Sequence, residues 1–203
     1  MRTRQFIVTA IAGVAGFAGV ALCLALIGSP NGAAPAGGVP SIGRPFALVD
    51  DTCAPVTEHT LAGKPYAIYF GYTFCPEVCP TTLLDLSRWI KQLGPNADKL
   101  NYVFVTVDPE RDKPASMHAY LSSFDRHIRG YTGTPEQVAK IAKEYRVYYK
   151  KIPTSDGGYV MDHSALIYLM GPDDKLVTVI AYQEADASAL TKLNNLASLT
   201  PSS

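Results

Sequence analysis

Two closely spaced cysteines are the residues of this sequence best suited to chemistry. Cys75 and Cys79 lie in GYTFCPEVCPTTL, directly after an apolar run and at the entry to a predicted helix. Four residues apart, their thiols lie on the same side of a helical turn, close enough for a disulfide bond or for joint ligation of a metal ion. A helix N-terminus also stabilises the thiolate, which is the form that binds metals and exchanges disulfides.

A purely structural role is the alternative for this pair, either as a disulfide or as two buried apolar side chains. A bridge that closes so short a loop constrains the unfolded chain little, so stability alone explains it poorly. The spacing therefore favours a functional dithiol at Cys75 and Cys79.

Two sulfurs alone do not complete a typical metal site, so the four histidines are the candidates for a further ligand. His163 directly precedes the apolar run at 165–170, on the sheet edge from which an imidazole can reach the dithiol loop. An isolated histidine at a strand start is more often structural, and its position leaves both roles open. The other histidines have polar or charged neighbours and are expected at the surface: His59, His118 and His127.

A strand, a helix and a second strand are predicted to position the dithiol. Residues 65–72 and 101–108 are short apolar runs typical of strands buried on both faces. Between them, Pro80 suits the first helical position, and apolar residues recur at helical spacing until Gly94. This order predicts a right-handed crossover with parallel pairing.

The rest of the chain completes an α/β pattern. Residues 165–170 and 176–181 are predicted to form an antiparallel hairpin, and residues 46–61 a small N-terminal one. Helices are expected from Pro114, with a period that continues through Leu121, Phe124 and Ile128, from Pro135 to Tyr145, and over 187–199. The pattern predicts a thioredoxin-like three-layer sandwich with an insertion before the C-terminal hairpin.

An N-terminal apolar segment predicts a membrane anchor. Residues 6–28 carry no charge, and as a helix they would be roughly 35 Å long, enough to cross a bilayer core of about 30 Å. Arg2 and Arg4 precede the run, so we expect the N-terminus in the cytoplasm and the rest outside. A cleaved signal peptide is the alternative, although such peptides have shorter apolar regions. Cys23 suggests a lipoprotein, but Leu22 occupies the preceding position, where a small residue is expected.

Composition and charge divide the chain further and exclude one class of partner. Residues 1–28 are predicted to be a single-pass transmembrane helix, 29–42 a flexible Pro-, Gly- and Ala-rich linker, and 43–203 the folded domain. The chain has 18 basic and 18 acidic residues, which leaves no electrostatic field for nucleic acid. The N-terminus lacks a long Arg- and Ser-rich transit region, so we expect a bacterial inner membrane with the domain in the periplasm.

Three sequence blocks together resemble the Sco/SenC family of membrane-anchored, copper-binding assembly factors of cytochrome c oxidase. They are YFGYTFCPEVCPTTL, VDPERDKP at 107–114 and MDHSALIYL at 161–169, with the LAGKP approach at 61–65. The resemblance spans about residues 43–199. The three blocks occur in the family's order behind a matching anchor, which makes the resemblance specific.

The resemblance implies a thioredoxin-like fold in which Cys75, Cys79 and His163 bind one copper ion, as Cu(I) or Cu(II). It also implies a role in building the binuclear copper centre of oxidase subunit II, by passing copper or by reducing that subunit's cysteines, with other copper chaperones as further partners. Thiolate and imidazole are ligands that suit copper, although the ligand types alone also allow zinc. A three-ligand set fits a transferable ion better than a closed zinc site.

Other functions remain open at this stage. A thiol-disulfide oxidoreductase would depend on Cys75 and Cys79 but not on His163, and whether the chain is an enzyme is undecided. The CxxxC spacing disfavours it, since the usual oxidoreductase motif is CxxC. A redox-signalling or interaction module without a metal is the third class.

Three details of the sequence have competing interpretations. VDPERDKP is either a strand-end turn, with a solvated Arg111 and a helix cap at Asp112, or a docking surface. Asp108 or Asp162 are candidates to orient His163 through a hydrogen bond. Cys53, where relatives commonly have a small residue, is either a simple turn residue or the source of an alternative disulfide.

Overall fold

The computed structural model describes residues 42, 43 and 45–199. The predicted anchor at 1–28 and nearly all of the predicted linker at 29–42 lie outside the described residues. Among the residues that are described, no helix combines the length and apolar character needed to cross a bilayer.

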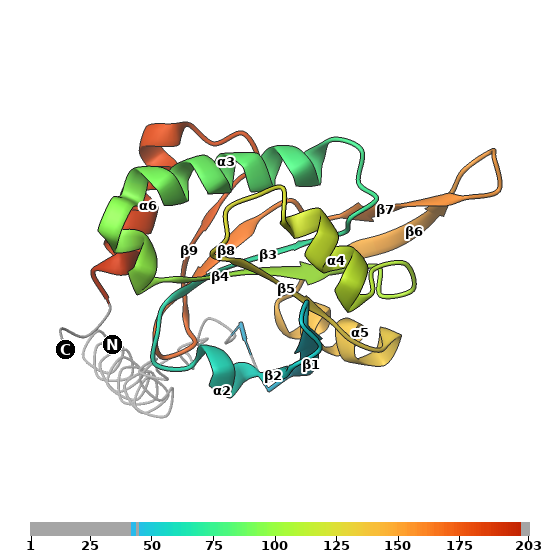
Figure 1. The fold of residues 1–203 in the computed structure, drawn as a ribbon, viewed down its shortest axis with the longest axis horizontal. Helices are drawn as coiled ribbons and strands as arrows, with labels where there is room; N and C mark the ends of the chain where they lie inside the picture. Colours follow the sequence, from blue (N-terminus) through green and yellow to red (C-terminus); the bar gives the residue numbers. More distant parts are fainter. Residues whose placement is uncertain (1–41, 44, 200–203) are drawn as a thin grey trace, which may run out of the picture. The chain divides into compact units, whose positions relative to one another are not determined.

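The described part of the chain contains one large mixed sheet and one small one (Figure 1). The large sheet has the strand order β2-β1-β5-β4-β3-β8-β9. Its strands are β1 (Ala47–Asp50), β2 (Pro55–Thr57), β3 (Tyr66–Gly71), β4 (Asn101–Thr106), β5 (Ile128–Thr132), β8 (Ile167–Met170) and β9 (Leu176–Ile180). The small sheet is the antiparallel pair β6 (Tyr149–Pro153) and β7 (Tyr159–His163).

Helices cover both faces of the large sheet, as a layered α/β sandwich requires. They are α2 (Glu58–Leu61), α3 (Val78–Leu93), the 3₁₀ helix η1 (Gly94–Lys99), α4 (Pro114–Leu121), α5 (Pro135–Glu144) and α6 (Asp186–Ala197). Figure 1 shows α3 and α6 on one face and α5 on the other. The layering confirms the predicted thioredoxin-like α/β architecture.

The centre of the sheet is parallel because crossover helices connect its strands. β3 pairs in parallel with β4, and β4 with β5, whereas β8 joins β3 in the antiparallel sense. Every residue of β3 is buried, which explains its unbroken apolar and aromatic sequence. The predicted strands at 65–72 and 101–108 and their parallel pairing are confirmed.

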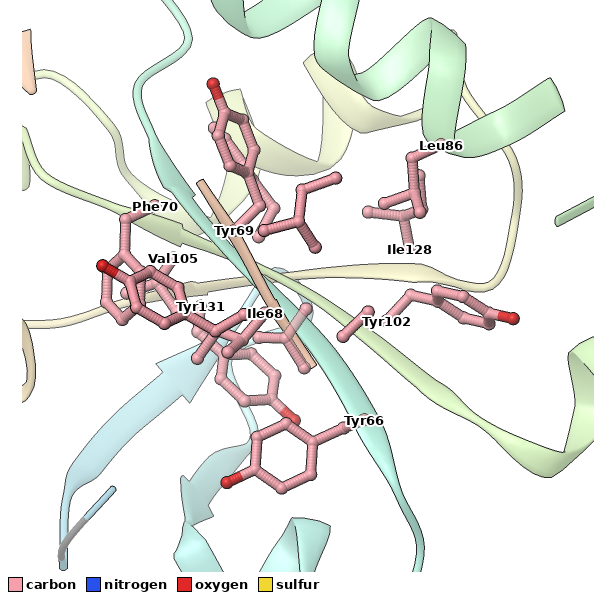
Figure 2. Packing of buried hydrophobic residues seen from close by; sticks show 14 of the residues in the cluster. Tyr66, Ile68, Tyr69, Phe70, Leu86, Tyr102, Val105, Ile128 and Tyr131 are labelled. Carbon is pink, nitrogen blue, oxygen red and sulfur yellow. The ribbon is translucent and has the colours of Figure 1, made fainter. Parts of the chain in front are cut away.

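Side chains of the central strands alternate between the two helical layers. Tyr66 and Tyr69 leave β3 on opposite sides, as Figure 2 shows. Phe70 packs against Tyr145 of the α5 side, with ring centroids 5.2 Å apart, while Tyr69 packs on Phe104 at 5.9 Å. Tyr69 therefore belongs to the layer on the α3 side of the sheet. Helix α3 carries Cys79.

The α4 region departs from the prediction. The expected helical period ran on to Ile128, but α4 ends at Leu121 and Ile128 begins β5. A turn intervenes, in which the Ile128 amide donates to the carbonyl of Asp125 at 3.0 Å. Ile128 is buried by pairing next to Tyr102 of β4, so strand pairing produced the apolar spacing that suggested a helix.

Two other segments also differ from expectation. The N-terminal hairpin exists as β1 and β2, but residues 58–61, expected in it, form the short helix α2. The predicted insertion contains β6 and β7, which sequence patterning missed because both strands are largely exposed. The C-terminal hairpin, now β8 and β9, and the last helix, α6, are confirmed within a few residues.

Candidate metal centre

Three separate elements bring the predicted ligand side chains together. Cys75 lies in the loop that follows β3, Cys79 is the second residue of α3, and His163 is the last residue of β7. One sulfur or nitrogen atom from each residue lies within 4.8 Å of the other two. In the part of the chain that the structure describes, no other set of three potential ligands meets in this way.

The end of β3 and the start of α3 place the two sulfurs. The amide of Cys79 donates to the sulfur of Cys75 at 3.4 Å, so the first turn of the helix points a backbone donor at this sulfur. The helix begins at Val78, two residues before the Pro80 that was expected to open it. Both cysteines therefore lie at the helix N-terminus, where negative charge on sulfur is stabilised.

Gly71 makes room for the deeper sulfur. A Cβ atom added at Gly71 would lie 2.9 Å from the sulfur of Cys79 and 2.7 Å from the ring of Phe104. Side chains larger than hydrogen therefore collide with this sulfur or with the core. The glycine in YFGYTFC is thus part of the site.

The two thiols differ in exposure and in acidity. The pKa of Cys75 is lowered to about 3, chiefly because the Cys79 thiol donates a hydrogen bond to its sulfur, with burial opposing and His163 assisting. The pKa of Cys79 is raised, because its proton is held by Cys75 and its side chain is fully buried. Cys75 is only partly buried, so it presents a thiolate at the surface while Cys79 holds a proton beneath it.

His163 directs Nε2 at the dithiol. Its Nδ1 lies 3.0 Å from the backbone carbonyl oxygen of Ser164, an acceptor, which assigns a proton to Nδ1. Nε2 lies 3.3 Å from the sulfur of Cys79, and it is the nitrogen that a neutral ring with this tautomer offers to a metal ion. The imidazole also contacts the rings of Tyr69 and Tyr72 at centroid distances of 6.3 and 5.8 Å, in edge-to-face geometry.

The expectation that a carboxylate orients His163 is wrong. The Ser164 carbonyl takes the hydrogen bond of Nδ1. Asp108 instead accepts from the hydroxyl of Tyr159 at 2.9 Å, and Asp162 is exposed. Ser164 is itself held in place, because its amide donates to the carbonyl of Tyr148 at 3.0 Å.

Asp112 of the VDPERDKP block holds the loop that carries Cys75 in place. This buried carboxylate accepts hydrogen bonds from the amide of Thr73 at 3.0 Å, from its hydroxyl at 2.5 Å and from the hydroxyl of Thr106 at 2.7 Å. Burial raises the pKa of Asp112 against these bonds. Asp112 is not the cap of α4, since Lys113 occupies that position with Ser116 as the capping partner.

Arg111 fastens the dithiol loop to the β6–β7 hairpin. Its guanidinium lies 4.7 Å from the ring centre of Phe74 and 3.8 Å from that of Tyr159, and it pairs with the carboxylate of Asp108. Nη1 also donates to the carbonyl of Tyr159 at 3.1 Å. The side chain is only 24% exposed, so the expectation of a solvated arginine is wrong. The block thus makes structural contacts other than the two expected ones, and its role in docking a partner stays a prediction.

The other histidines and Cys53 lie apart from this cluster. His59 is exposed beside Glu58, and His118, also exposed, pairs through Nδ1 with Asp51 at 2.9 Å, as expected for surface residues. His127 is more enclosed than expected, between Asp125 and Asp98. Cys53 is an exposed free thiol in the turn between β1 and β2, with a φ of 68° that L residues rarely adopt.

Sequence reasoning missed the residues that support the ligands. Tyr69 and Tyr72 contact His163, and Asp112 holds the loop that carries Cys75. The available signal was the aromatic alternation of YFGY and the buried position that an acidic residue takes after a strand. Neither signal specifies a contact, because both depend on how segments distant in the sequence pack.

Comparison with known proteins assigns the chain to a family. Residues 34–198 match the SCO1/SenC family along most of the sequence. The chain belongs to the SCO1/SenC family. This assignment confirms the resemblance inferred from the three sequence blocks.

SCO1/SenC relatives occur in plants, fungi and bacteria. The chain is 41% identical to the mitochondrial SCO1 homolog 1 of Arabidopsis thaliana, over 70% of this chain and 43% of that protein. It is 38% identical to the mitochondrial SCO1 of Saccharomyces cerevisiae, over 77% of this chain and 54% of that protein. The chain thus spans about half the length of these curated relatives.

Solved SCO1/SenC structures share the fold. The ScoI protein of Bradyrhizobium japonicum, solved with copper bound, is 49% identical with a TM-score of 0.72, covering 77% of this chain and 99% of that one. Yeast Sco1, also solved with copper bound, is 37% identical with a TM-score of 0.71, covering 77% and 88%.

Proposed function

We propose that this chain is a copper-binding protein that helps to build the binuclear copper centre of cytochrome c oxidase subunit II. The observation that carries the proposal is the meeting of Cys75, Cys79 and His163 within 4.8 Å, with Nε2 of the histidine directed at the Cys79 sulfur. Family membership and the copper-bound relatives support the same conclusion.

The donor set suits a copper ion that must later leave. Two sulfurs and one imidazole nitrogen are soft to borderline ligands, which favour copper as Cu(I) or Cu(II). Structural zinc sites normally have four protein ligands, whereas this cluster offers three among the described residues. A site with three ligands leaves one side open to a ligand from a partner.

Exposure suggests the order in which the ligands exchange. Cys75 is the outer of the two thiols, Cys79 is buried, and the half-buried His163 contacts the ring of Tyr69 in β3. A thiolate or imidazole of subunit II, or of another copper chaperone, would therefore meet the metal on the Cys75 side. The same exposed thiolate is able to attack a disulfide of the partner, so copper transfer and thiol reduction share one entry point.

The location follows from the N-terminal segment. We infer a single-pass anchor at residues 1–28, a tether at 29–42 and a periplasmic domain at 43–203 in the inner membrane of a bacterium. An apolar run of bilayer length behind two arginines supports the anchor and its orientation. A tethered domain stays near an oxidase subunit in the same membrane.

Copper stoichiometry of the full chain tests the proposal. We expect about one copper ion per chain and a sulfur-to-Cu(II) absorption band. His163→Ala should weaken Cu(II) binding by more than about a hundredfold, since loss of outer-shell partners alone costs up to that factor. His59→Ala, at an exposed histidine outside the cluster, is the matched control and should bind normally. Unchanged copper binding by the His163 variant would refute the proposed site.

A thiol-disulfide oxidoreductase without metal delivery is the second candidate. The lowered pKa of Cys75 favours it, since this thiol is ionised near neutral pH. Reduction of a disulfide in a peptide that carries the cysteines of subunit II separates the two functions. Activity lost with Cys75→Ser and kept with His163→Ala would favour the oxidoreductase, provided that the wild-type chain binds no copper.

A further inference from the structure

Tyr69 carries a hydroxyl group that the fold buries without a partner. Its side chain is fully buried, and the hydroxyl forms no hydrogen bond with any described residue. Buried polar groups in native proteins are nearly always paired, and an exception calls for an explanation. The hydroxyl is thus a buried hydrogen-bond donor without an acceptor.

Tyr69 points to the side of β3 on which the dithiol lies. Residues 69 and 71 point to the same side of β3, and the sulfur of Cys79 lies 2.9 Å from the Cβ position of Gly71. The Tyr69 ring also lies 6.3 Å from the ring of His163. A phenol has a pKa of about 10 and keeps its proton at neutral pH, so the hydroxyl is available as a donor.

Metal binding changes what the Cys79 sulfur can accept. The sulfur of a neutral thiol is a weak hydrogen-bond acceptor, whereas a cysteine binds a metal ion as a thiolate. A thiolate accepts hydrogen bonds strongly, and Tyr69 holds an unpaired donor on the same side of β3 as this sulfur.

We propose that Tyr69 is a positioning residue of the metal centre, whose hydroxyl donates a hydrogen bond to the Cys79 sulfur when that sulfur binds copper. This inference rests on the proposed function, because it requires a metal-bound thiolate at Cys79. The hydrogen bond draws electron density away from the sulfur, and such bonds tune the redox potential of copper–thiolate sites. It also holds the more buried ligand, Cys79, in place while Cys75 remains free to exchange.

Phenylalanine at position 69 removes only the hydroxyl. The ring, which packs on Phe104 at 5.9 Å, is retained in Tyr69→Phe. The matched control is Tyr102→Phe, since the Tyr102 hydroxyl is also buried and unpaired among the described residues, but its ring packs near His127 instead of the dithiol. Both variants lose a buried unpaired hydroxyl, and only one loses the donor to Cys79.

Copper titration and absorption spectra of the full chain compare the two variants with the wild type. We expect Tyr69→Phe to weaken copper binding about tenfold, the lower range for loss of an outer-shell partner. Its sulfur-to-Cu(II) band should move to lower energy, because the thiolate becomes more electron-rich. Tyr102→Phe should leave both quantities unchanged. In the metal-free form, both variants should melt at or above the wild-type temperature, because each removes an unsatisfied buried group.

A second substitution protects the test against poor folding of Tyr69→Phe. 3-Fluorotyrosine at position 69 keeps the ring and the O–H group but makes the phenol a stronger donor. The absorption band should then move to higher energy, opposite to the shift in Tyr69→Phe.

The outcomes separate this inference from the proposed function. A wild-type chain that binds no copper would overturn both. A wild-type chain that binds copper normally, with the same affinity and the same band in Tyr69→Phe, would overturn the role of Tyr69 alone. Equal shifts in Tyr69→Phe and Tyr102→Phe would also overturn it, because they would reflect a general effect on the core.

Discussion

The two sides of the candidate metal centre are built differently. Cys75 and Cys79 follow β3, a central strand of the large sheet in which every residue is buried. His163 ends β7, which belongs to a separate two-stranded sheet and has only Met161 buried. The dithiol is therefore placed by the hydrophobic core, whereas the imidazole is placed by a hairpin at its edge.

Few polar contacts hold the hairpin against the core. The hydroxyl of Tyr159 donates to the buried carboxylate of Asp108 at 2.9 Å, and Arg111 donates to the Tyr159 carbonyl at 3.1 Å. Lys151 pairs with Glu110 at 2.7 Å, but both side chains are well exposed, and such pairs contribute little. The difference teaches that changes in the core should alter stability, whereas changes in the hairpin should alter metal affinity.

The largest expected effect comes from the core side. Asp112→Ala removes the acceptor of three hydrogen bonds and leaves donors of Thr73 and Thr106 unpaired. We expect the free energy of unfolding to fall by about 3 kcal/mol, measured by urea denaturation of the metal-free protein. Asp162→Ala, at an exposed carboxylate of the hairpin, is the control and should change it by less than about 0.5 kcal/mol. Similar losses in both variants would contradict the comparison.

Native-state hydrogen exchange measures the local stability of the central strands and of the β6–β7 hairpin separately. Amides of β3 and β4 should exchange only through global unfolding, because these strands are buried and paired on both sides. Amides hydrogen-bonded between β6 and β7 should exchange through local opening of the hairpin. The free energy of this opening should be about 2 kcal/mol or more below the free energy of global unfolding. Added copper should reduce the difference between these two free energies. The comparison fails if the hairpin amides already match those of β3.

Tyr159→Phe tests the attachment of the hairpin to the core. The substitution keeps the ring under Arg111 but removes the hydroxyl that donates to Asp108. We expect a loss of about 1 kcal/mol in the free energy of unfolding, together with weaker copper binding, because His163 is placed less firmly. Calorimetric copper titration checks the second part. Tyr148→Phe, at an exposed tyrosine next to β6, should change neither quantity.

The smallest effect lies outside the candidate metal centre and depends on pH. The pKa of Glu184 is lowered to about 2 against its burial by hydrogen bonds from Lys192, Ser188 and the Ala181 amide. A lowered carboxyl pKa stabilises the fold above the unfolded value and loses this contribution as the pH falls toward about 2. The carboxylate is partly exposed, so we expect Glu184→Gln to cost only about 1 kcal/mol at pH 7. The cost should shrink between about pH 4.5 and 2, with copper binding at pH 7 unchanged.

Parts of the fold with strong local patterns were predictable. The runs at 65–72 and 101–108 and the helical period that ends before Gly94 correspond to β3, β4 and α3. The β6–β7 hairpin was missed because Lys150 and Lys151 keep β6 mostly exposed and polar. Ile128 was assigned to a helix because an apolar residue at helical spacing is equally well buried in a strand.

The sequence by itself determined the family blocks, the spacing of Cys75 and Cys79 and their position after a central strand, since these depend on neighbours along the chain. Only the tertiary structure decided that Nε2 of His163 faces the dithiol while Nδ1 faces the Ser164 carbonyl, and that Arg111 is enclosed between aromatic rings. Those facts depend on contacts between segments far apart in sequence. Local propensity and periodicity carry no information about such contacts until the chain has packed.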